Sequence, residues 1–326
     1  MKRTSPAVLI LLLLSLSTVP AMRVCAQTAN SAPAAPAVPP NPLKIALLKW
    51  YNANTTTSFT VGNEPRGVCF DGANIWVANY GSNTVTKLQA SDGSVLGTYN
   101  VGSEPASVAF DGANVWVTNF GSNNITKLSA SDGTVLGTFS AGSSPFGLAF
   151  DGANMWVGGA GTVTKIRASD GKTLGTFAEV GQSYGVAFDG TYIWATNGNA
   201  GTITRFKQDG TNSGVFSLGA SGTPWGVAFD GTNIWVADSQ AQGMLVELNP
   251  GTGAVLASTL VGGAPYGVVF DGAYVWVTTE TNVTQIQPST AAILRRVSTP
   301  EASTGIAFDG ANLWVSHYGG GYISKM

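Results

Sequence analysis

The sequence is short of the residues on which many enzymes and nucleic-acid-binding proteins depend. Its 326 residues include one His, two Cys and only 10% charged residues, with 16 Lys and Arg against 18 Asp and Glu. So little positive charge argues against binding a nucleic-acid backbone. A single His excludes a His-Glu-x-x-His metal motif, and no P-loop is present. The composition therefore gives no signature of catalysis, and we predict no cofactor and no metal site.

Long apolar runs are missing except near the N-terminus. There Lys2 and Arg3 precede an apolar run from Ala7 to Leu16, and small residues end the region at Val24-Cys25-Ala26. This pattern predicts a cleaved signal peptide over residues 1–26, because the run is shorter than the roughly 20 residues of a membrane span. An uncleaved N-terminal anchor is the alternative. We therefore expect an exported protein, periplasmic or extracellular at the cell surface, with no membrane span after cleavage.

Cleavage of the signal peptide would also change the number of cysteines and the net charge. It removes Cys25 and three basic residues, leaving Cys69 alone and 13 basic against 18 acidic residues, a net charge of −5. One cysteine cannot form an internal disulfide, and the apolar neighbours Val68 and Phe70 predict a buried, inert thiol. Residues 27–54 then read as an Ala- and Pro-rich spacer followed by a short apolar segment, Leu43 to Tyr51.

Glycine and aromatic residues are abundant, and they recur at a fixed period. The chain has 42 Gly, and a Trp follows every Phe-Asp-Gly by six residues from its Phe. The repeats are spaced 38 to 41 residues apart. The seven motifs begin at Phe70, Phe110, Phe150, Phe188, Phe229, Phe270 and Phe308. Such a period marks a repeat architecture.

One repeat reads as four short strands. Asp71-Gly72 is a hairpin signal after an apolar stretch, Ile75-Trp76-Val77 is an apolar run typical of a strand buried on both faces, and Asp92-Gly93 turns the chain again. Four antiparallel strands in about 40 residues are a propeller blade. We therefore predict an all-β, seven-bladed β-propeller with four-stranded blades over residues 55–326, with the seven Trp between the blades.

The ring has a predicted closing device. The last repeat ends at Met326, where its fourth strand is missing, while Thr55 to Val61 aligns with a fourth strand that has no blade of its own. This N-terminal strand should complete the blade that begins near Thr304 and so remove an open sheet edge.

Two segments, Trp116-Val117-Thr118-Asn119 and Trp76-Val77-Ala78-Asn79, are close to the YVTN motif. The repeats therefore resemble the YVTN-type repeats of bacterial propellers. They are also similar to NHL-type propellers and, in fold, to streptogramin lyases. The resemblance covers about residues 55–326. It implies the fold strongly and the function weakly, because propellers host many activities.

At two positions of the repeat the fold does not dictate which residue is present, and these are our candidate site positions. The first lies four residues before each Phe and holds four aromatic residues in successive blades, which suit sugars, apolar rings or peptides, together with an arginine that suits an anion. Its seven occupants are Arg66, Ala106, Phe146, Tyr184, Trp225, Tyr266 and Thr304. Packing of these side chains against neighbouring loops is the alternative interpretation.

The second position lies three residues after each Trp. Asn at this position should close the turn into the third strand by side-chain to backbone bonds, and Asp238 and His317 depart from it. His317 is a candidate general base, with Glu280 one blade earlier as its acidic neighbour; a surface or loop His without a role is the alternative. Because acid–base chemistry needs paired groups, catalysis is not expected.

These observations favour a binding scaffold, expected to be a monomer, that recognises a protein, a glycan or a small molecule on the loop face around the channel. Two alternatives stay open: a streptogramin-lyase-like, metal-assisted enzyme, and a structural cell-surface protein without a small ligand.

Overall fold

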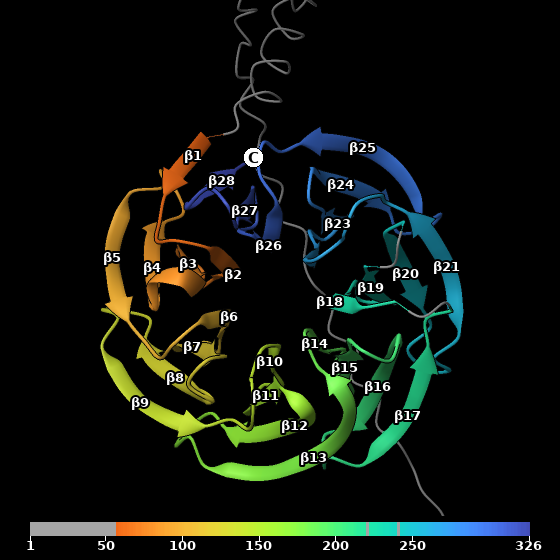
Figure 1. Cartoon of the computed structure of the whole chain (residues 1–326), viewed down its shortest axis with the longest axis horizontal. Coiled ribbons are helices and arrows are strands. Elements are labelled where there is room, and N and C mark those ends of the chain that lie inside the picture. The colour runs from red at the N-terminus through yellow and green to blue at the C-terminus, as the bar shows by residue number, and fades with distance from the viewer. Residues whose placement is uncertain (1–56, 220–221, 240–241) are drawn as a thin grey trace, which may run out of the picture. The chain divides into compact units, whose positions relative to one another are not determined.

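The computed structural model describes residues 57–326 except 220–221 and 240–241. These residues form a ring of seven four-stranded antiparallel sheets (Figure 1). The all-β, seven-bladed propeller is therefore confirmed. The predictions for residues 1–54, including the signal peptide and the spacer, lie outside the described residues.

Six blades consist of four consecutive strands each, running from the channel outward. The first three are β2 (Pro65–Phe70), β3 (Asn74–Asn79), β4 (Thr84–Gln89) and β5 (Val95–Asn100); β6 (Pro105–Phe110), β7 (Asn114–Asn119), β8 (Asn124–Ser129) and β9 (Val135–Ser140); and β10 (Leu148–Phe150), β11 (Asn154–Gly158), β12 (Ala160–Arg167) and β13 (Thr173–Gln182). A short 3₁₀ turn, η1 (Tyr80–Ser82), follows β3.

The next three blades repeat this order. They are β14 (Val186–Phe188), β15 (Tyr192–Asn197), β16 (Thr202–Lys207) and β17 (Asn212–Ser217); β18 (Pro224–Phe229), β19 (Ile234–Asp238), β20 (Met244–Leu248) and β21 (Val255–Leu260); and β22 (Val268–Phe270), β23 (Val275–Thr278), β24 (Asn282–Gln287) and β25 (Ala292–Ser298).

The seventh blade joins the two ends of the described chain. Its strand order is β26 (Ser303–Phe308), β27 (Leu313–His317), β28 (Tyr322–Lys325) and β1 (Thr57–Thr60). β1 pairs antiparallel with β28, with Thr57 opposite Lys325 and Thr60 opposite Tyr322. The predicted closing strand is therefore confirmed, and the ring has no unpaired seam.

The Asp-Gly turns explain why each repeat folds as a hairpin. Gly72 has a φ of 98°, a conformation that residues with a Cβ avoid. Asp71 Oδ1 accepts hydrogen bonds from the backbone N–H groups of Ala73 and Asn74, at 2.9 and 2.6 Å. The turn is thus held by the side chain that begins it.

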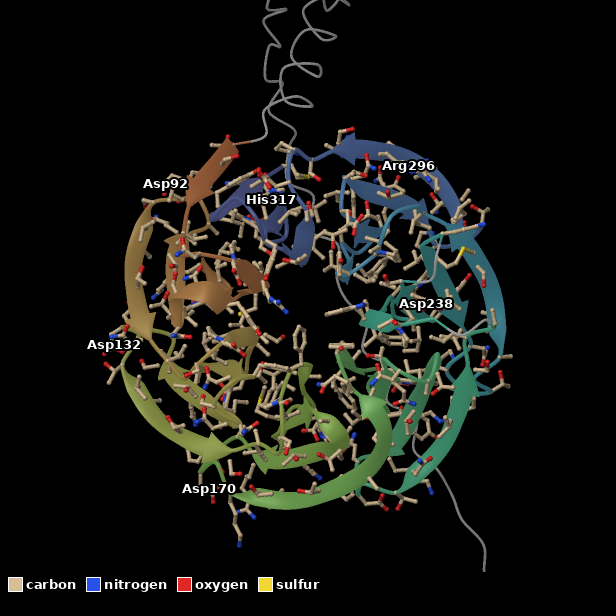
Figure 2. The ribbon with its side chains drawn as sticks, in the orientation of Figure 1. Asp92, Asp132, Asp170, Asp238, Arg296 and His317 are labelled. Atoms are coloured by element: carbon tan, nitrogen blue, oxygen red, sulfur yellow. The ribbon has the colours of Figure 1, made fainter. Side chains whose placement is uncertain are left out.

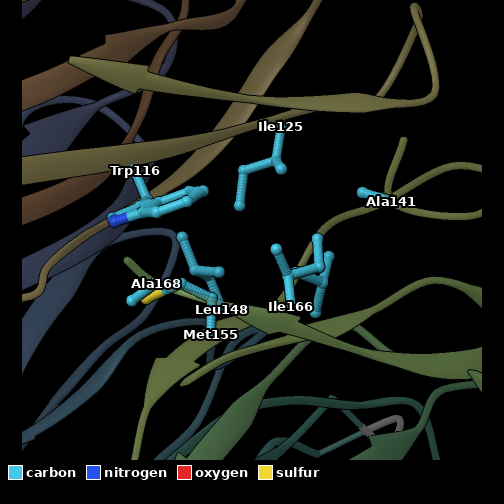
Figure 3. Packing of buried hydrophobic residues seen from close by; sticks show 8 residues of the cluster. Trp116, Ile125, Ala141, Leu148, Met155, Ile166 and Ala168 are labelled. Atoms are coloured by element: carbon cyan, nitrogen blue, oxygen red, sulfur yellow. The ribbon is translucent and has the colours of Figure 1, made fainter. Parts of the chain in front are cut away.

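The core lies between the blades rather than within them. Trp116 of the second blade is fully buried against Leu148, Met155 and Ile166 of the third (Figure 3). The other repeat Trp residues are buried to a similar degree, none more than 4% exposed. A four-stranded sheet exposes two faces, and stacking in a ring buries both, so the prediction that the Trp residues fill the gaps is confirmed.

The environment of Cys69 agrees with the prediction of an inert cysteine. The residue is half-buried and packs against the cluster around Trp76, and burial raises the pKa of its thiol.

Among the described residues, no helix is long and apolar enough to cross a membrane.

Candidate ligand-binding site

All seven residues of the first candidate position meet at the centre of the ring. Each lies at or just before the start of an innermost strand, and together they line one cavity of about 370 Å³. The lining also includes Tyr318 from the last blade. Because the repeat places seven equivalent positions around one point, residues far apart in the sequence line one cavity.

Aromatic rings form a continuous arc along this pocket. Tyr184 and Trp225 stack with ring centroids 3.9 Å apart and planes 17° apart. Phe146 meets both of them edge-on, at 5.3 and 5.8 Å, and Tyr266 meets Trp225 at 5.3 Å. All four side chains are half-buried, so part of each ring is exposed. The predicted arc thus exists, and its rings support one another.

Arg66 lies at the Phe146 end of the arc. Its guanidinium lies over the ring of Tyr80, 3.8 Å from the centroid, and it is 5.0 Å from the centroid of Tyr318 and 5.7 Å from that of Phe146. The Tyr80 hydroxyl donates a 3.0 Å hydrogen bond to Glu104 Oε2. Burial and this bond raise the pKa of Tyr80, so the ring beneath Arg66 stays a neutral phenol.

Hydroxyl groups from the preceding blade fix the backbone of several pocket residues. Thr118 Oγ1 donates to the carbonyl of Phe146 at 2.8 Å, and Thr196 Oγ1 donates to that of Trp225 at 3.1 Å. Ser316 Oγ of the last blade donates to the carbonyl of Arg66 at 2.5 Å. The pocket residues are therefore held by the contacts that hold the blades together.

Sequence reasoning missed a third repeat position, four residues after each Trp. It supplies Tyr80, Phe120 and Tyr318, of which Tyr318 lines the pocket and the other two extend the arc from Phe146. The signal was available, because aromatic residues recur at this offset in three repeats.

Asp238 and His317 do not belong to the pocket. Both are fully buried and lie within their blades, set back from the centre of the ring (Figure 2). The interpretation of His317 as a surface or loop residue is therefore wrong. The reason is that strands β19 and β27 extend to the second candidate position, so its side chains enter the interior.

His317 instead belongs to a buried polar network. Its Nε2 lies 2.9 Å from Ser324 Oγ and its Nδ1 lies 3.3 Å from Ser303 Oγ, and its ring stacks on Tyr322. Burial lowers the pKa of His317, an effect that Glu301 partly offsets. The residue is therefore neutral in the fold and not placed to act on a ligand in the pocket.

The Asn residues at this second position behave partly as expected. Asn79 Oδ1 accepts a hydrogen bond from the backbone N–H of Gly62 at 3.1 Å, but Asn79 Nδ2 donates to the hydroxyls of Thr84 and Thr86. The bonds to the third strand are thus between side chains, not to the backbone of the turn.

Glu280 lies on the exposed rim rather than in the pocket. Burial raises the pKa of Tyr266, and the negative charge of Glu280 raises it further, which places this carboxylate near one end of the arc. Glu280 and His317 are not brought together by any contact within the described residues, so they do not form the pair that the catalytic interpretation needs.

A buried carboxyl lies outside the pocket, at Glu179 of β13. Its two oxygens are shielded from solvent, and burial raises its pKa to about 8, which the nearby Ser183 and Thr204 hydroxyls only partly offset. Other blades place apolar residues here, such as Val101 and Leu218. Sequence reasoning missed this departure.

The segment Gly181-Gln182-Ser183-Tyr184-Gly185 matches the Gly-x-Ser-x-Gly pattern of hydrolases. Here it joins β13 to β14 with no helix following, and Ser183 is fully buried. The pattern therefore serves the turn between two blades. The residues that the structure describes contain no cluster of three or more His, Cys, Asp or Glu arranged to hold a metal ion.

The fold and pocket define a seven-bladed β-propeller with an aromatic central cavity. No protein-family model matches the chain, and no curated protein matches it. Among solved structures the chain is similar to a streptogramin B lyase, with 17% identity, a TM-score of 0.71 and coverage of 83% of this chain and 96% of the other. A catalytically inactive virginiamycin B lyase from Staphylococcus aureus with quinupristin gives 17% identity, the same TM-score and coverage of 83% and 98%.

Hydrazine synthase of Kuenenia stuttgartiensis is similar to the same degree, with 16% identity, a TM-score of 0.70 and coverage of 84% and 97%. At identities this low, the TM-scores establish a shared fold alone, and proteins with such different names share it. The YVTN and NHL assignments stay predictions.

Proposed function

We propose that this protein is an exported binding protein that holds a small ligand in the aromatic pocket at the centre of the ring. The observation that carries the proposal is the convergence of seven equivalent repeat positions on one cavity lined by Phe146, Tyr184, Trp225 and Tyr266. A cavity of about 370 Å³ is at the lower end of the sizes usual for small-molecule sites.

The composition of the lining supports the same function. Most of the lining residues are aromatic, Ala or Gly, and Arg66 is the one charged residue among them. Small-molecule sites typically combine an apolar wall with a few polar groups that fix orientation. Hydrogen bonds from hydroxyl groups of neighbouring blades fix the backbone of pocket residues before a ligand binds. Such preorganisation lowers the entropic cost of binding.

A lyase like the neighbours in fold is the second candidate. The similarity to a virginiamycin B lyase with quinupristin favours testing that ligand. This function would need catalytic groups other than His317, because that side chain is buried in the last blade.

A thermal-shift screen of the purified protein tests the proposal. The panel contains glycans, aromatic acids, short peptides, and quinupristin with and without Mg²⁺. A ligand at about 100 times its Kd stabilises the fold by about 2.7 kcal/mol, enough to raise Tm by several degrees. Trp225→Ala should abolish the shift, whereas Leu96→Ala, on the exposed outer strand β5, should not.

The outcomes separate the three functions. A shift that depends on Trp225 supports a binding protein, and loss of intact quinupristin by mass spectrometry supports the lyase. A shift that survives Trp225→Ala places the ligand elsewhere. No shift with any compound contradicts the proposal and favours the structural surface protein.

A further inference from the structure

Arg66 has a positive charge without a counter-charge in the pocket. Across the described ranges its guanidinium makes no ion pair and no hydrogen bond, and its Nε is shielded from solvent without an acceptor. A donor withdrawn from water and left unpaired is costly, and more so when it is charged. Because Arg66 lines the cavity and its guanidinium has no acceptor there, a ligand in the pocket can supply one.

The stacking of Arg66 fixes where that acceptor must lie. The Arg66 Cζ lies 3.8 Å from the centroid of the Tyr80 ring, too close for an edge-on contact, so the guanidinium meets the ring with its face. The N–H donors lie in the plane of the guanidinium, and a planar fork of donors matches the two oxygens of a carboxylate. Stacking thus leaves the edge of Arg66 available to an anion.

The neighbours of Arg66 determine what should be attached to the anion. The centroid of the Phe146 ring is 5.7 Å from the guanidinium carbon, and the stacked pair of Tyr184 and Trp225 packs against Phe146. An anion at Arg66 therefore places the body of its molecule against aromatic rings. A flat apolar or aromatic body fills this space best.

The other charges around the pocket limit the charge of the ligand. Glu104 accepts a hydrogen bond from the hydroxyl of Tyr80, the ring on which Arg66 stacks, and Glu280 lies close enough to Tyr266 to raise the pKa of that tyrosine. One lining cation and these two carboxylates favour a single negative charge over a dianion such as a phosphate monoester.

We propose that the ligand is a monocarboxylate with an aromatic body, its carboxylate bound by the edge of Arg66 and its ring packed against Phe146 and Trp225. This inference rests on the proposed function of the pocket. Two sources share this chemistry: a free aromatic acid, and the C-terminal aromatic residue of a peptide.

Calorimetric titration of the full chain with matched probes tests the inference. The probes are 3-phenylpropionate and its amide, N-acetyl-Ala-Ala-Phe with a free and an amidated C-terminus, and phenyl phosphate. We expect at least one free carboxylate to bind ten-fold or more tightly than its amide, and more tightly than phenyl phosphate. Which acid binds better identifies the source.

Variants assign the effect to Arg66. Arg66→Gln should remove the preference for the acid while leaving the amide's affinity unchanged, which also shows that the variant is folded. Arg66→Lys should retain only part of the preference, because it loses the planar fork. Arg167→Gln removes a positive charge from an exposed pair with Asp170 and should leave both affinities unchanged.

Failure of the inference differs from failure of the proposed function. Equal affinities for acid and amide, both lost in Trp225→Ala, overturn the role of Arg66 while the pocket remains the binding site. Tighter binding of phenyl phosphate overturns the charge argument. Absence of binding by every probe overturns the proposed ligand class, and it contradicts the proposed function as well if the wider thermal-shift panel is also silent.

Discussion

The indole Nε1 of Trp76 donates a 2.7 Å hydrogen bond to Oδ2 of Asp71, the residue that begins the preceding turn. The same bond occurs in all seven blades, at 2.6 to 2.8 Å. One carboxylate thus holds both the turn and the Trp between the blades. Burial alone would raise the pKa of Asp71, but its hydrogen bonds with Trp76, Ala73 and Asn74 outweigh burial and lower it.

Replacing Asp71 with Ala should destabilise the protein even though only one blade is changed. The substitution leaves the Trp76 N–H without its acceptor and removes the turn bonds, a loss of about 1–3 kcal/mol in the free energy of unfolding. Urea denaturation at pH 7 measures it. Asp92→Ala, at an exposed turn on the periphery (Figure 2), is the control and should have a much smaller effect. Equal effects would contradict the role of the indole bond.

Ring closure by β1 makes a second prediction. Phe59 of β1 packs on Trp314 of β27 with ring centroids 5.5 Å apart, so its removal weakens the seam between the chain ends. We expect Phe59→Ala to lower the free energy of unfolding by about 2 kcal/mol, less than a fully buried Phe because this ring is half-exposed. Deleting residues 55–61 should lower Tm much further.

The control for Phe59 is Val95→Ala, because Val95 is an apolar residue of an outer strand that is 53% exposed. It should change stability by less than about 0.5 kcal/mol. Unchanged melting of the deletion variant would show that the seventh blade does not need β1.

Glu179 predicts a loss of stability as pH rises. The folded state keeps the Glu179 proton up to about pH 8, whereas the unfolded state releases it near pH 4.5. The contribution of this group to stability is therefore fully present below pH 4.5 and is lost progressively up to about pH 8. The free energy of unfolding should fall by up to about 1.4 kcal/mol per pH unit in this window. Denaturation of Glu179→Gln should show a flatter profile, and the exposed Glu280→Gln should keep the wild-type slope.

The lowered pKa of His317 predicts the opposite pH dependence of stability, in a lower pH range. Its pKa is lowered in the fold, so the unfolded state binds a proton first, and stability is lost as pH falls below about 6.5. His317→Asn, the residue that three other blades carry at this position, should remove the loss. The measurement is best made in the Glu179→Gln background, where the opposing slope is absent. A wild-type-like acid profile in His317→Asn would show that another group titrates.

The fold could be predicted because each repeat contains the local signals that define a blade. The Asp-Gly turns, the central Trp and the leftover strand before Val61 are local signals, and the period of about 40 residues repeats them seven times. The first candidate position was predictable for the same reason, since a position that the scaffold does not dictate stands out when repeats are aligned.

The rest of the site depends on relations that no single repeat contains. The stacking of Arg66 on Tyr80 and Tyr318 brings together the first and last blades, which only the closed ring places side by side. Asp238 and His317 were misplaced because a one-residue difference in where a strand ends decides whether a side chain faces the interior or the loop. Glu179 is a polar residue at an apolar position, and only its packing shows that it is buried.

The hydrogen bond from Ser316 to the carbonyl of Arg66 joins residues separated by 250 positions in the chain. The chain must therefore be synthesised as far as Ser316 before Arg66 acquires this neighbour from the last blade. A chain clipped before Ser316 has an open arc in which Arg66 lacks that hydrogen bond. The pocket around Arg66 is thus complete only when the ring is closed, and a ligand bound there should slow the opening of the seam between β1 and β28.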